Sequence, residues 1–363
     1  MSFEDAAIVL ADGTLFEGES IGASPDGGVT TGEFVFNTVL SGYQEVISDP
    51  SYAGQVITFT YPHIGNYGVN AADDESVPPH CAGVVVRELA RRHSSWRAES
   101  DLDSYLVRHG VAGIAGVDTR RLTRHLRDHG ALPGAFGTAD EATLRSSARS
   151  AVGTDGRDLV ATVSTTRAVH HAASAGATRR IVAIDLGIKS TIVRNLVTVG
   201  SVEVLPASTS AADILAREPD GVFVSNGPGD PAAVEQVPAT LRELLGEVPV
   251  FGICMGHQML ATAVGGSTYK LPFGHHGGNH PVRDLTTGKV EITSQNHNYC
   301  VDLAGLSNVS VTHRNLNDDT VEGFECTDVP AFAVQHHPEA GPGPHDSRYL
   351  FERFAELMDR HSS

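Results

Sequence analysis

The stretch from Val248 to Val264, VPVFGICMGHQMLATAV, constrains the fold more than any other part of the chain. It begins with an apolar run rich in β-branched residues, which predicts a buried parallel strand. It ends with apolar residues at helical spacing, and Gly265 and Gly266 close the predicted helix. Cys254 falls between the two, with a glycine two residues away on each side. This stretch therefore predicts a sharp strand–turn–helix that presents Cys254 above a sheet.

A cysteine in such a turn is well placed for nucleophilic chemistry. A thiol reacts as its thiolate, and the unpaired N–H groups at a helix N-terminus favour that negative charge. The backbone N–H of Met255, which follows the cysteine, is placed to stabilise an oxyanion. The alternative is that Cys254 is a structural thiol buried at the end of a strand. The turn by itself leaves both interpretations open.

Composition excludes several classes of protein. With 363 residues the chain is long enough for two domains. Its formal net charge of -18 argues against general nucleic-acid binding. There is no apolar N-terminal signal segment and no apolar run of about 18 residues, so we expect no membrane span. The four cysteines show no C-x-x-C spacing, which favours reduced thiols in the cytoplasm.

Residues 1–150 are predicted to form an N-terminal mixed β/α domain, which is a candidate for contact with a partner protein. Turn residues separate short apolar runs, and two later segments have helical spacing. The expected strands are Ala7–Leu10, Val35–Leu40, Gln55–Thr60 and Val84–Val86, and the expected helices are Asp101–His109 and Thr119–Arg127. The arginines of the second helix are either solvated charge or part of a partner surface. The loops Gly42–Tyr52 and Tyr61–Gly68 have the residues of binding loops, although ordinary turns use the same residues.

The remaining chain is predicted to be a linker followed by an α/β domain. Residues 151–178 are rich in Ser, Thr, Ala and Gly without periodicity, which predicts a linker. In residues 179–363, apolar strands alternate with helices, which predicts an open, mostly parallel sheet with helices on both faces. Ligands of such sheets bind beyond the carboxyl ends of the strands. The glycine-containing loop Asn226–Pro231 and Cys254 are both expected at that edge.

Partner groups for Cys254 occur near the end of the chain. A short predicted strand, Ala331–Gln335, leads into the sequence HHPE. In extended backbone, residues i and i+2 point the same way, so His337 and Glu339 are expected to project together. His337 would then act as the base for Cys254, and Glu339 would orient it. His336 has the wrong parity for that role.

Several histidines also raise the question of a metal site. They are His275, His276, His280, His336 and His337. Neither the two-histidine spacing of a helical zinc site nor a Cys/His set occurs. We therefore predict no metal.

The motif GICMGHQ at Gly252–Gln258, together with His337-Pro338-Glu339, resembles the class I (triad) glutamine amidotransferase domain. Further stretches narrow the resemblance to the small, glutaminase subunit family of carbamoyl-phosphate synthetase. These stretches are Phe273–Pro281, Ser294–His297, Pro338–Asp346, Asn226–Pro231 and the two N-terminal loops at Gly42–Tyr52 and Tyr61–Gly68. The likeness covers nearly the whole chain. Its N-terminal part is the most specific, because other class I amidotransferases lack it.

That resemblance implies hydrolysis of glutamine and delivery of ammonia to a large synthetase subunit, which makes carbamoyl phosphate for arginine and pyrimidine synthesis. It implies that Cys254 is the nucleophile, His337 the base and Glu339 its orienting residue. The implied glutamine site contains Ser51, Gly227, Gly229, Met255, Gln258, Asn296, Asn298 and Tyr299. No cofactor is expected in this subunit, and ATP and Mg are expected on the large subunit.

One position departs from the family pattern. Asn298 stands where the family usually has glycine. Asparagine is the residue that best tolerates left-handed backbone after glycine, so a backbone contact is still expected there, although its side chain could clash. Asn298 is therefore the least secure of the implied contacts.

Two other functions stay open at this point. A different Cys–His hydrolase on the same sheet, such as a peptidase-like relative, would explain the turn at Cys254. It would not explain the N-terminal domain, Gln258 or Asn296. A catalytically silent subunit that only gates or scaffolds its partner is the other alternative, and the intact Cys254, His337 and Glu339 argue against it.

Overall fold

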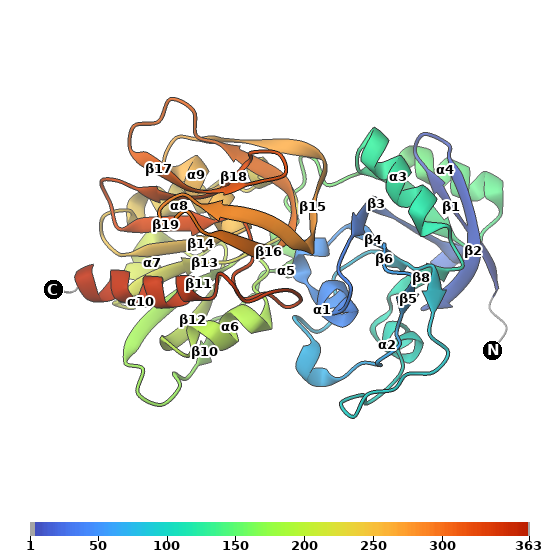
Figure 1. Ribbon diagram of the computed structural model, residues 1–363, viewed down its shortest axis with the longest axis horizontal. Coiled ribbons are helices and arrows are strands. Elements are labelled where there is room, and N and C mark those ends of the chain that lie inside the picture. The colour runs from blue at the N-terminus through green and yellow to red at the C-terminus, as the bar shows by residue number, and fades with distance from the viewer. Residues whose placement is uncertain (1–3, 362–363) are drawn as a thin grey trace. The chain divides into compact units, whose positions relative to one another are not determined.

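The computed structural model describes residues 4–361, which form two compact units (Figure 1). The N-terminal unit contains the chain up to Asp155 together with Pro272–His276. The C-terminal unit contains Gly156–Leu271 and the chain from Gly277 onward. Within the N-terminal unit, the ring of Phe273 stacks on Phe36 with ring centroids 5.8 Å apart. The short segment 272–276 is therefore packed into the N-terminal unit although it lies far along the chain.

The N-terminal unit is built on a closed barrel of short strands. Around the barrel the strands follow the order β1, β2, β8, β6, β4, β3, β9. Their bounds are β1 (Asp5–Leu10), β2 (Leu15–Gly22), β3 (Val29–Asn37), β4 (Gln55–Phe59), β6 (Gly83–Val85), β8 (Ala112–Ala115) and β9 (Leu132–Gly137), and β5 (His63–Ile64) pairs separately with β7 (Glu88–Leu89). Parallel and antiparallel pairs both occur, which confirms a mixed β/α domain. Closure leaves no free sheet edge in this barrel.

Helices cover the barrel, and α2, α3 and α4 each begin at a capping aspartate. They are α1 (Tyr43–Ser48), α2 (Leu102–His109), α3 (Thr119–His129) and α4 (Glu141–Ser150), with short 3-10 turns η1 (Asp26–Gly28), η2 (Pro50–Tyr52) and η3 (Ala71–Asp73). The Asp118 side chain accepts the N–H of Arg121 at 3.0 Å, which satisfies one of the free donors of the first turn of α3. Leu122 and Leu126 of α3 are fully buried, and the arginines of that helix lie on its exposed side.

The C-terminal unit is built on a large sheet whose central strands are parallel. The strand order is β10, β12, β11, β13, β14, β19, β18, β17, β15, β16. The bounds are β10 (Val169–His171), β11 (Arg179–Asp185), β12 (Gly200–Pro206), β13 (Gly221–Val224), β14 (Val250–Ile253), β15 (Ser267–Asp284), β16 (Val290–Asp302), β17 (Val309–Asn315), β18 (Val321–Cys326) and β19 (Ala331–Val334). The run β12-β11-β13-β14-β19 is parallel throughout. This confirms the predicted open, mostly parallel sheet.

Helices lie on both faces of this sheet, as predicted (Figure 1). They are α5 (Val160–Val163), α6 (Ser190–Leu196), α7 (Ala211–Leu215), η4 (Pro231–Ala233), α8 (Gln236–Leu244), α9 (Met255–Ala263) and α10 (Tyr349–His361). Successive residues of β11 point to opposite faces: Val182 packs in the core with α8 and α9, whereas Ile181 packs in the core with α6 and α10. The sheet is therefore buried on both sides, as its apolar strands require.

The predicted linker at residues 151–178 is wrong in part. Val169–His171 forms β10, which pairs antiparallel with β12 at the edge of the sheet. Val160 of α5 is buried in the core below the sheet. An edge strand exposes one face and one side to water, so it needs little apolar sequence and leaves a weak pattern. Among residues 4–361, no helix combines the length and the apolar character needed to cross a bilayer.

Candidate active site

Cys254 sits at the carboxyl end of β14 and immediately before α9, in a strained conformation. Its φ is 55° and its ψ is -104°, a region that side-chain-bearing residues rarely adopt. Such strain costs on the order of 1–3 kcal/mol and persists where the surroundings enforce it. Here the Cys254 N–H donates to the Val334 carbonyl at 2.9 Å, and the Gly256 N–H donates to the Ser225 carbonyl at 3.0 Å. The predicted sharp turn is thus present and is held from both neighbouring strands.

The two glycines beside Cys254 are required by close backbone approach. A Cβ on Gly252 would lie 2.6 Å from the carbonyl oxygen of Gly256, and a Cβ on Gly256 would clash with the carbonyl oxygen of Val224. The helix α9 therefore packs directly onto strand backbone. The glycines two residues before and after Cys254 are therefore required by this packing as well as by the turn itself.

His337 and Glu339 project together, as the i, i+2 argument predicts. Nδ1 of His337 lies 2.6 Å from Oε1 of Glu339, and both side chains are buried. The His337 N–H donates to the Ser294 carbonyl at 2.9 Å, which anchors the segment after β19 to β16. His336 faces the other way, with Nδ1 3.8 Å from Oε2 of Glu322. The pairing of His337 rather than His336 with Glu339 is confirmed.

The imidazole of His337 lies between an acidic partner and the thiol of Cys254. Burial alone would lower its pKa, but the charge of Glu339, the charge of a Cys254 thiolate and the hydrogen bond to Glu339 raise the pKa of His337 to about 10. No well-aligned hydrogen bond within residues 4–361 reaches Nε2 of His337. That nitrogen is therefore the one available for proton transfer with Cys254 and a substrate.

Lys189 completes the site, and sequence reasoning missed it. Its Nζ lies 2.9 Å from Oε1 of Glu339 and donates to the carbonyl of Ala340 at 2.7 Å. Burial alone would raise the pKa of Glu339, but the charges of Lys189 and His337 and their hydrogen bonds lower it to about 2. Glu339 is thus a carboxylate between two cations. The only sequence signal was the rarity of lysine, since Lys189 is one of three in the chain.

The loop after β13 supplies glycine backbone at the same edge of the sheet. A Cβ on Gly227 would clash with the carbonyl of Leu186, and Gly229 has a φ of 89°, so both positions favour glycine. The side chain of Asn226, at the start of the loop, accepts the N–H of Lys189 at 3.3 Å. Met255 is the first residue of α9, so its N–H has no acceptor within the helix. The Gly227–Gly229 backbone and the Met255 N–H are the candidate oxyanion donors.

Two of the predicted glutamine-site residues of the C-terminal unit, Gln258 and Asn296, lie close to Cys254. The thiol sulfur is 3.5 Å from the carbonyl oxygen of Asn296 in β16. The Gln258 side chain donates its Nε2 hydrogens to the Tyr299 carbonyl at 2.8 Å and to Oε1 of Gln335 at 3.1 Å. Both hydrogens are used, so Gln258 has its Oε1 left as an acceptor. Asn296 and Tyr299 are buried on the same strand.

Asn298 differs from the expectation. It lies inside β16 and is not among the described residues with positive φ, so the argument from left-handed backbone is wrong. A regular strand accepts asparagine without backbone strain. Ser51 lies in η2 of the N-terminal unit, where its N–H donates to the Asp49 side chain at 2.9 Å. Its membership of the glutamine site stays a prediction.

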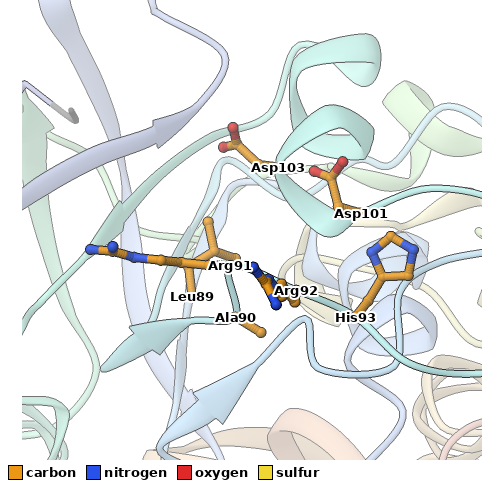
Figure 2. A pocket seen from close by; sticks show the side chains of 7 residues that line it. All are labelled: Leu89, Ala90, Arg91, Arg92, His93, Asp101 and Asp103. Atoms are coloured by element: carbon orange, nitrogen blue, oxygen red, sulfur yellow. The ribbon is translucent and has the colours of Figure 1, made fainter. Parts of the chain in front are cut away.

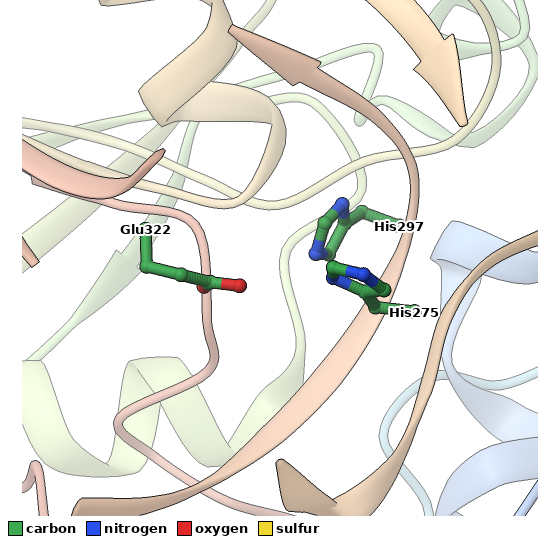
Figure 3. A group of neighbouring side chains, drawn as sticks. All are labelled: His275, His297 and Glu322. Atoms are coloured by element: carbon green, nitrogen blue, oxygen red, sulfur yellow. The ribbon is translucent and has the colours of Figure 1, made fainter. Parts of the chain in front are cut away.

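Two other features carry no assigned chemistry. Figure 3 shows His297 of β16 and Glu322 of β18, both in the C-terminal unit. Both ring nitrogens of His297 already have hydrogen-bond partners, so we assign no metal site. The N-terminal unit also contains a cavity of about 490 Å³, and Figure 2 shows the residues that line it. None of these lining residues is a cysteine or a serine, so the lining offers no such nucleophile. The lining residues are Leu89, Ala90, Arg91, Arg92, His93, Asp101 and Asp103.

Comparison with known proteins gives two family matches and close relatives. Residues 8–136 match the family model of the carbamoyl-phosphate synthase small chain, CPSase domain, and residues 182–357 match glutamine amidotransferase class-I. The chain is 50% identical over 371 residues to the carbamoyl phosphate synthase small chain of Syntrophotalea carbinolica, covering 98% of each. It is 50% identical to that of Rhodopirellula baltica, covering 98% of this chain and 96% of the relative. A strained cysteine turn, a His–Glu pair and these full-length matches lead to one assignment: the chain belongs to the carbamoyl phosphate synthase small chain family.

Proposed function

We propose that this chain is the glutaminase subunit of a glutamine-hydrolysing carbamoyl-phosphate synthetase, an amidotransferase component of a ligase. Cys254 is its nucleophile, His337 its acid and base, and Glu339 the residue that orients His337. The strained turn at Cys254 beside the buried His337–Glu339 pair is the observation that supports this most directly. Family membership supplies the substrate, glutamine, and the product, ammonia for carbamoyl phosphate.

The first half-reaction makes a thioester. The Cys254 thiolate attacks the side-chain amide carbon of glutamine, and negative charge develops on the amide oxygen. The N–H of Met255 and the N–H of one glycine, Gly227 or Gly229, stabilise that oxyanion, each such donor contributing about 3–4 kcal/mol. Protonated His337 gives its Nε2 proton to the leaving nitrogen, the C–N bond breaks, and ammonia departs.

The second half-reaction restores the enzyme. Neutral His337 takes a proton from water, and the resulting hydroxide attacks the γ-glutamyl thioester carbon. The C–S bond then breaks, giving glutamate and the Cys254 thiolate beside an imidazolium. The raised pKa of His337 favours a protonated imidazole in the resting state. Glu339, held by Lys189, keeps Nδ1 of His337 protonated so that Nε2 does the transfer.

Substrate recognition rests on polar groups around Cys254. The free Oε1 of Gln258 is a hydrogen-bond acceptor, which suits an ammonium or amide N–H of glutamine. Asn296, Asn298 and Tyr299 of β16 line the same region, and Ser51 of the N-terminal unit completes the proposed set. No cofactor or metal is needed in this subunit, because the triad supplies both nucleophile and proton transfer.

The ammonia goes to a large synthetase subunit that binds ATP and Mg. Ammonia released into neutral water would mostly become ammonium and lose its nucleophilicity, so a closed path to the synthetase is part of the proposal. The described cysteines are free thiols, which agrees with a reducing cytoplasm. The products would serve arginine and pyrimidine biosynthesis.

The decisive experiment is to purify the chain together with its large subunit and measure glutamine-dependent carbamoyl phosphate. We expect glutamate and carbamoyl phosphate to form together. Cleavage of peptides without glutamate release from glutamine would instead support the peptidase-like alternative. Failure of a reactive-carbon glutamine analogue to label Cys254 would support a silent gating subunit.

A further inference from the structure

A buried hydrogen-bonded chain joins side chains of β16 to Glu322 of β18. Nε2 of Gln295 donates to Oε2 of Glu322 at 2.9 Å and to Oγ1 of Thr293 at 3.0 Å. Oε1 of Gln295 lies 3.0 Å from Nε2 of His297. Nδ1 of His297 lies 2.8 Å from the carbonyl oxygen of Tyr299. Gln295, His297 and Glu322 are 1%, 5% and 0% exposed, so water cannot substitute for these bonds.

The partners of His297 determine where its protons are. A carbonyl oxygen only accepts, so Nδ1 of His297 must carry a proton to bond Tyr299. A carboxylate also only accepts, so Glu322 draws the amide NH₂ of Gln295 toward itself. The amide oxygen of Gln295 then faces His297, and it too only accepts. Nε2 of His297 must therefore carry a second proton.

We propose that Glu322 is a positioning residue for the glutaminase reaction: through Gln295 it holds His297 as a doubly protonated imidazolium, which fixes the strand that carries the glutamine contacts. Figure 3 shows the Glu322 carboxyl group of β18 directed toward the His297 ring of β16. A buried cation and a buried anion bridged by one amide satisfy each other's charge, whereas either alone would be costly. This inference rests on the proposed function for its kinetic part only.

Two of the titratable groups near Glu322 are neutral. Burial lowers the pKa of His257 to about 4 and that of His313 to about 3, so both rings are neutral. Burial raises the pKa of Cys300, whose sulfur lies 4.0 Å from Nδ1 of His297, and the carboxylates of Glu322 and Asp318 add to the rise. His336 has neither ring nitrogen hydrogen-bonded within the described part of the chain. The acceptor oxygens at both of its ring nitrogens identify His297 as the hydrogen-bonded cation of this chain.

The link to the glutamine site is the Tyr299 carbonyl. It accepts hydrogen bonds from Nδ1 of His297 and from Nε2 of Gln258. Asn296 directly precedes His297 in β16, and its carbonyl oxygen lies 3.5 Å from the Cys254 sulfur. Loss of the second proton on His297 would break its hydrogen bond to Gln295, one of the bonds that fix β16. Glutamine binding should suffer more than the chemical step, because Cys254, His337 and Glu339 are untouched.

The test combines a spectroscopic and a kinetic measurement on the full chain. Nitrogen-15 NMR of histidine-labelled protein, with the His297→Gln variant to assign the signal, is expected to show both ring nitrogens protonated at about pH 8. In Glu322→Gln one nitrogen should lose its proton. In the complex with the large subunit, the KM for glutamine should then rise about tenfold while kcat changes less than about threefold. Ammonia-dependent synthesis should be unchanged.

Two variants separate positioning from general structural damage. Glu322→Asp keeps the negative charge and should restore the doubly protonated ring and most of the lost affinity. Glu325→Gln, which removes a carboxylate of the same strand that pairs with Arg353, should leave His297 and the KM unchanged. A singly protonated His297 in the unaltered chain, or an unchanged ring and KM in Glu322→Gln, overturns the proposal. An unaltered chain that hydrolyses no glutamine would refute the proposed function, while the NMR result would still decide the state of His297.

Discussion

Nζ of Lys189 lies 2.9 Å from Oε1 of Glu339, the same oxygen that is 2.6 Å from Nδ1 of His337. One carboxylate oxygen therefore serves two cationic groups, and all three side chains are at most 2% exposed. A buried charge is stable only when it is paired. The carboxylate that contacts the His337 ring is thus held by an ion pair that reaches back to the loop after β11.

Replacing Lys189 by methionine tests that dependence. Breaking a buried ion pair from one side leaves an uncompensated charge and typically costs about 3–5 kcal/mol. We expect Lys189→Met to lower the free energy of unfolding by that order in urea titrations and to reduce glutaminase kcat. Lys289→Met, which removes an exposed lysine, is the matched control and should change neither. Equal stability of the two variants would contradict the ion-pair interpretation.

Replacing Cys254 by alanine or serine tests the nucleophile. Without a thiolate no thioester forms, so glutamine-dependent carbamoyl phosphate synthesis should fall by at least about a thousandfold in the complex. Ammonia-dependent synthesis should persist, because it bypasses this site. Cys326→Ser removes a partly buried thiol outside the site and should behave like the unaltered chain. Undiminished glutaminase activity in Cys254→Ala would refute the assignment.

Replacing Gly256 by alanine tests the packing behind the turn. The added Cβ would clash with the carbonyl of Val224 in β13, so either α9 or β13 must shift. We expect a loss of about 2–4 kcal/mol in unfolding free energy, together with reduced kcat from a displaced Cys254. Gly110→Ala, at a φ of 70° with open space around the new Cβ, should cost only about 1 kcal/mol and spare activity. Similar losses in both variants would argue against close packing.

The pH dependence of stability should show the depressed pKa of Glu339. Its pKa is 4.5 in an ordinary setting and about 2 in the folded chain, so the unfolded state binds the proton more readily. Its contribution to stability is therefore complete above pH 4.5 and is lost as pH falls toward 2. The stability difference between the unaltered chain and Glu339→Gln should shrink across that window in urea titrations.

His337 should produce the opposite trend on the alkaline side. Its pKa rises from 6.5 to about 10 on folding, so the folded state holds the proton more tightly. That contribution is complete below pH 6.5 and disappears as pH rises through 10. The free energy of unfolding of the unaltered chain should therefore fall between pH 6.5 and pH 10. In His337→Gln this part of the fall should be absent. A flat difference between the two chains over this range would show that His337 is not protonated in the folded state.

Local spacing made part of the site predictable. The turn at Cys254 depends on glycines two residues away, and the pairing of His337 with Glu339 depends on the parity of extended backbone. Both are short-range consequences of chain geometry. The alternation of strands and helices also predicts the parallel sheet, because each βαβ unit is contiguous in sequence.

The rest depends on contacts between distant residues. Lys189 and Glu339 are separated by 150 positions, and no local pattern marks Lys189 as part of a site. The strands β15 and β16 carry polar and histidine-rich sequence that hides their extended structure. The closure of the N-terminal barrel joins β1 to β9 across most of that unit, which short apolar runs cannot reveal. Long-range pairing is the part of a fold that periodicity does not encode.

The segment 272–276 has a practical consequence for dissecting this protein. It contributes Phe273 and the carbonyl of His276, which accepts the N–H of Thr38, to the unit formed by the first 155 residues. A fragment ending at Asp155 would lack this piece, and a fragment starting at Gly156 would carry it without its packing partners. Neither half is therefore a complete autonomous module. Truncation, limited proteolysis and modular fusion should be planned around the intact polypeptide.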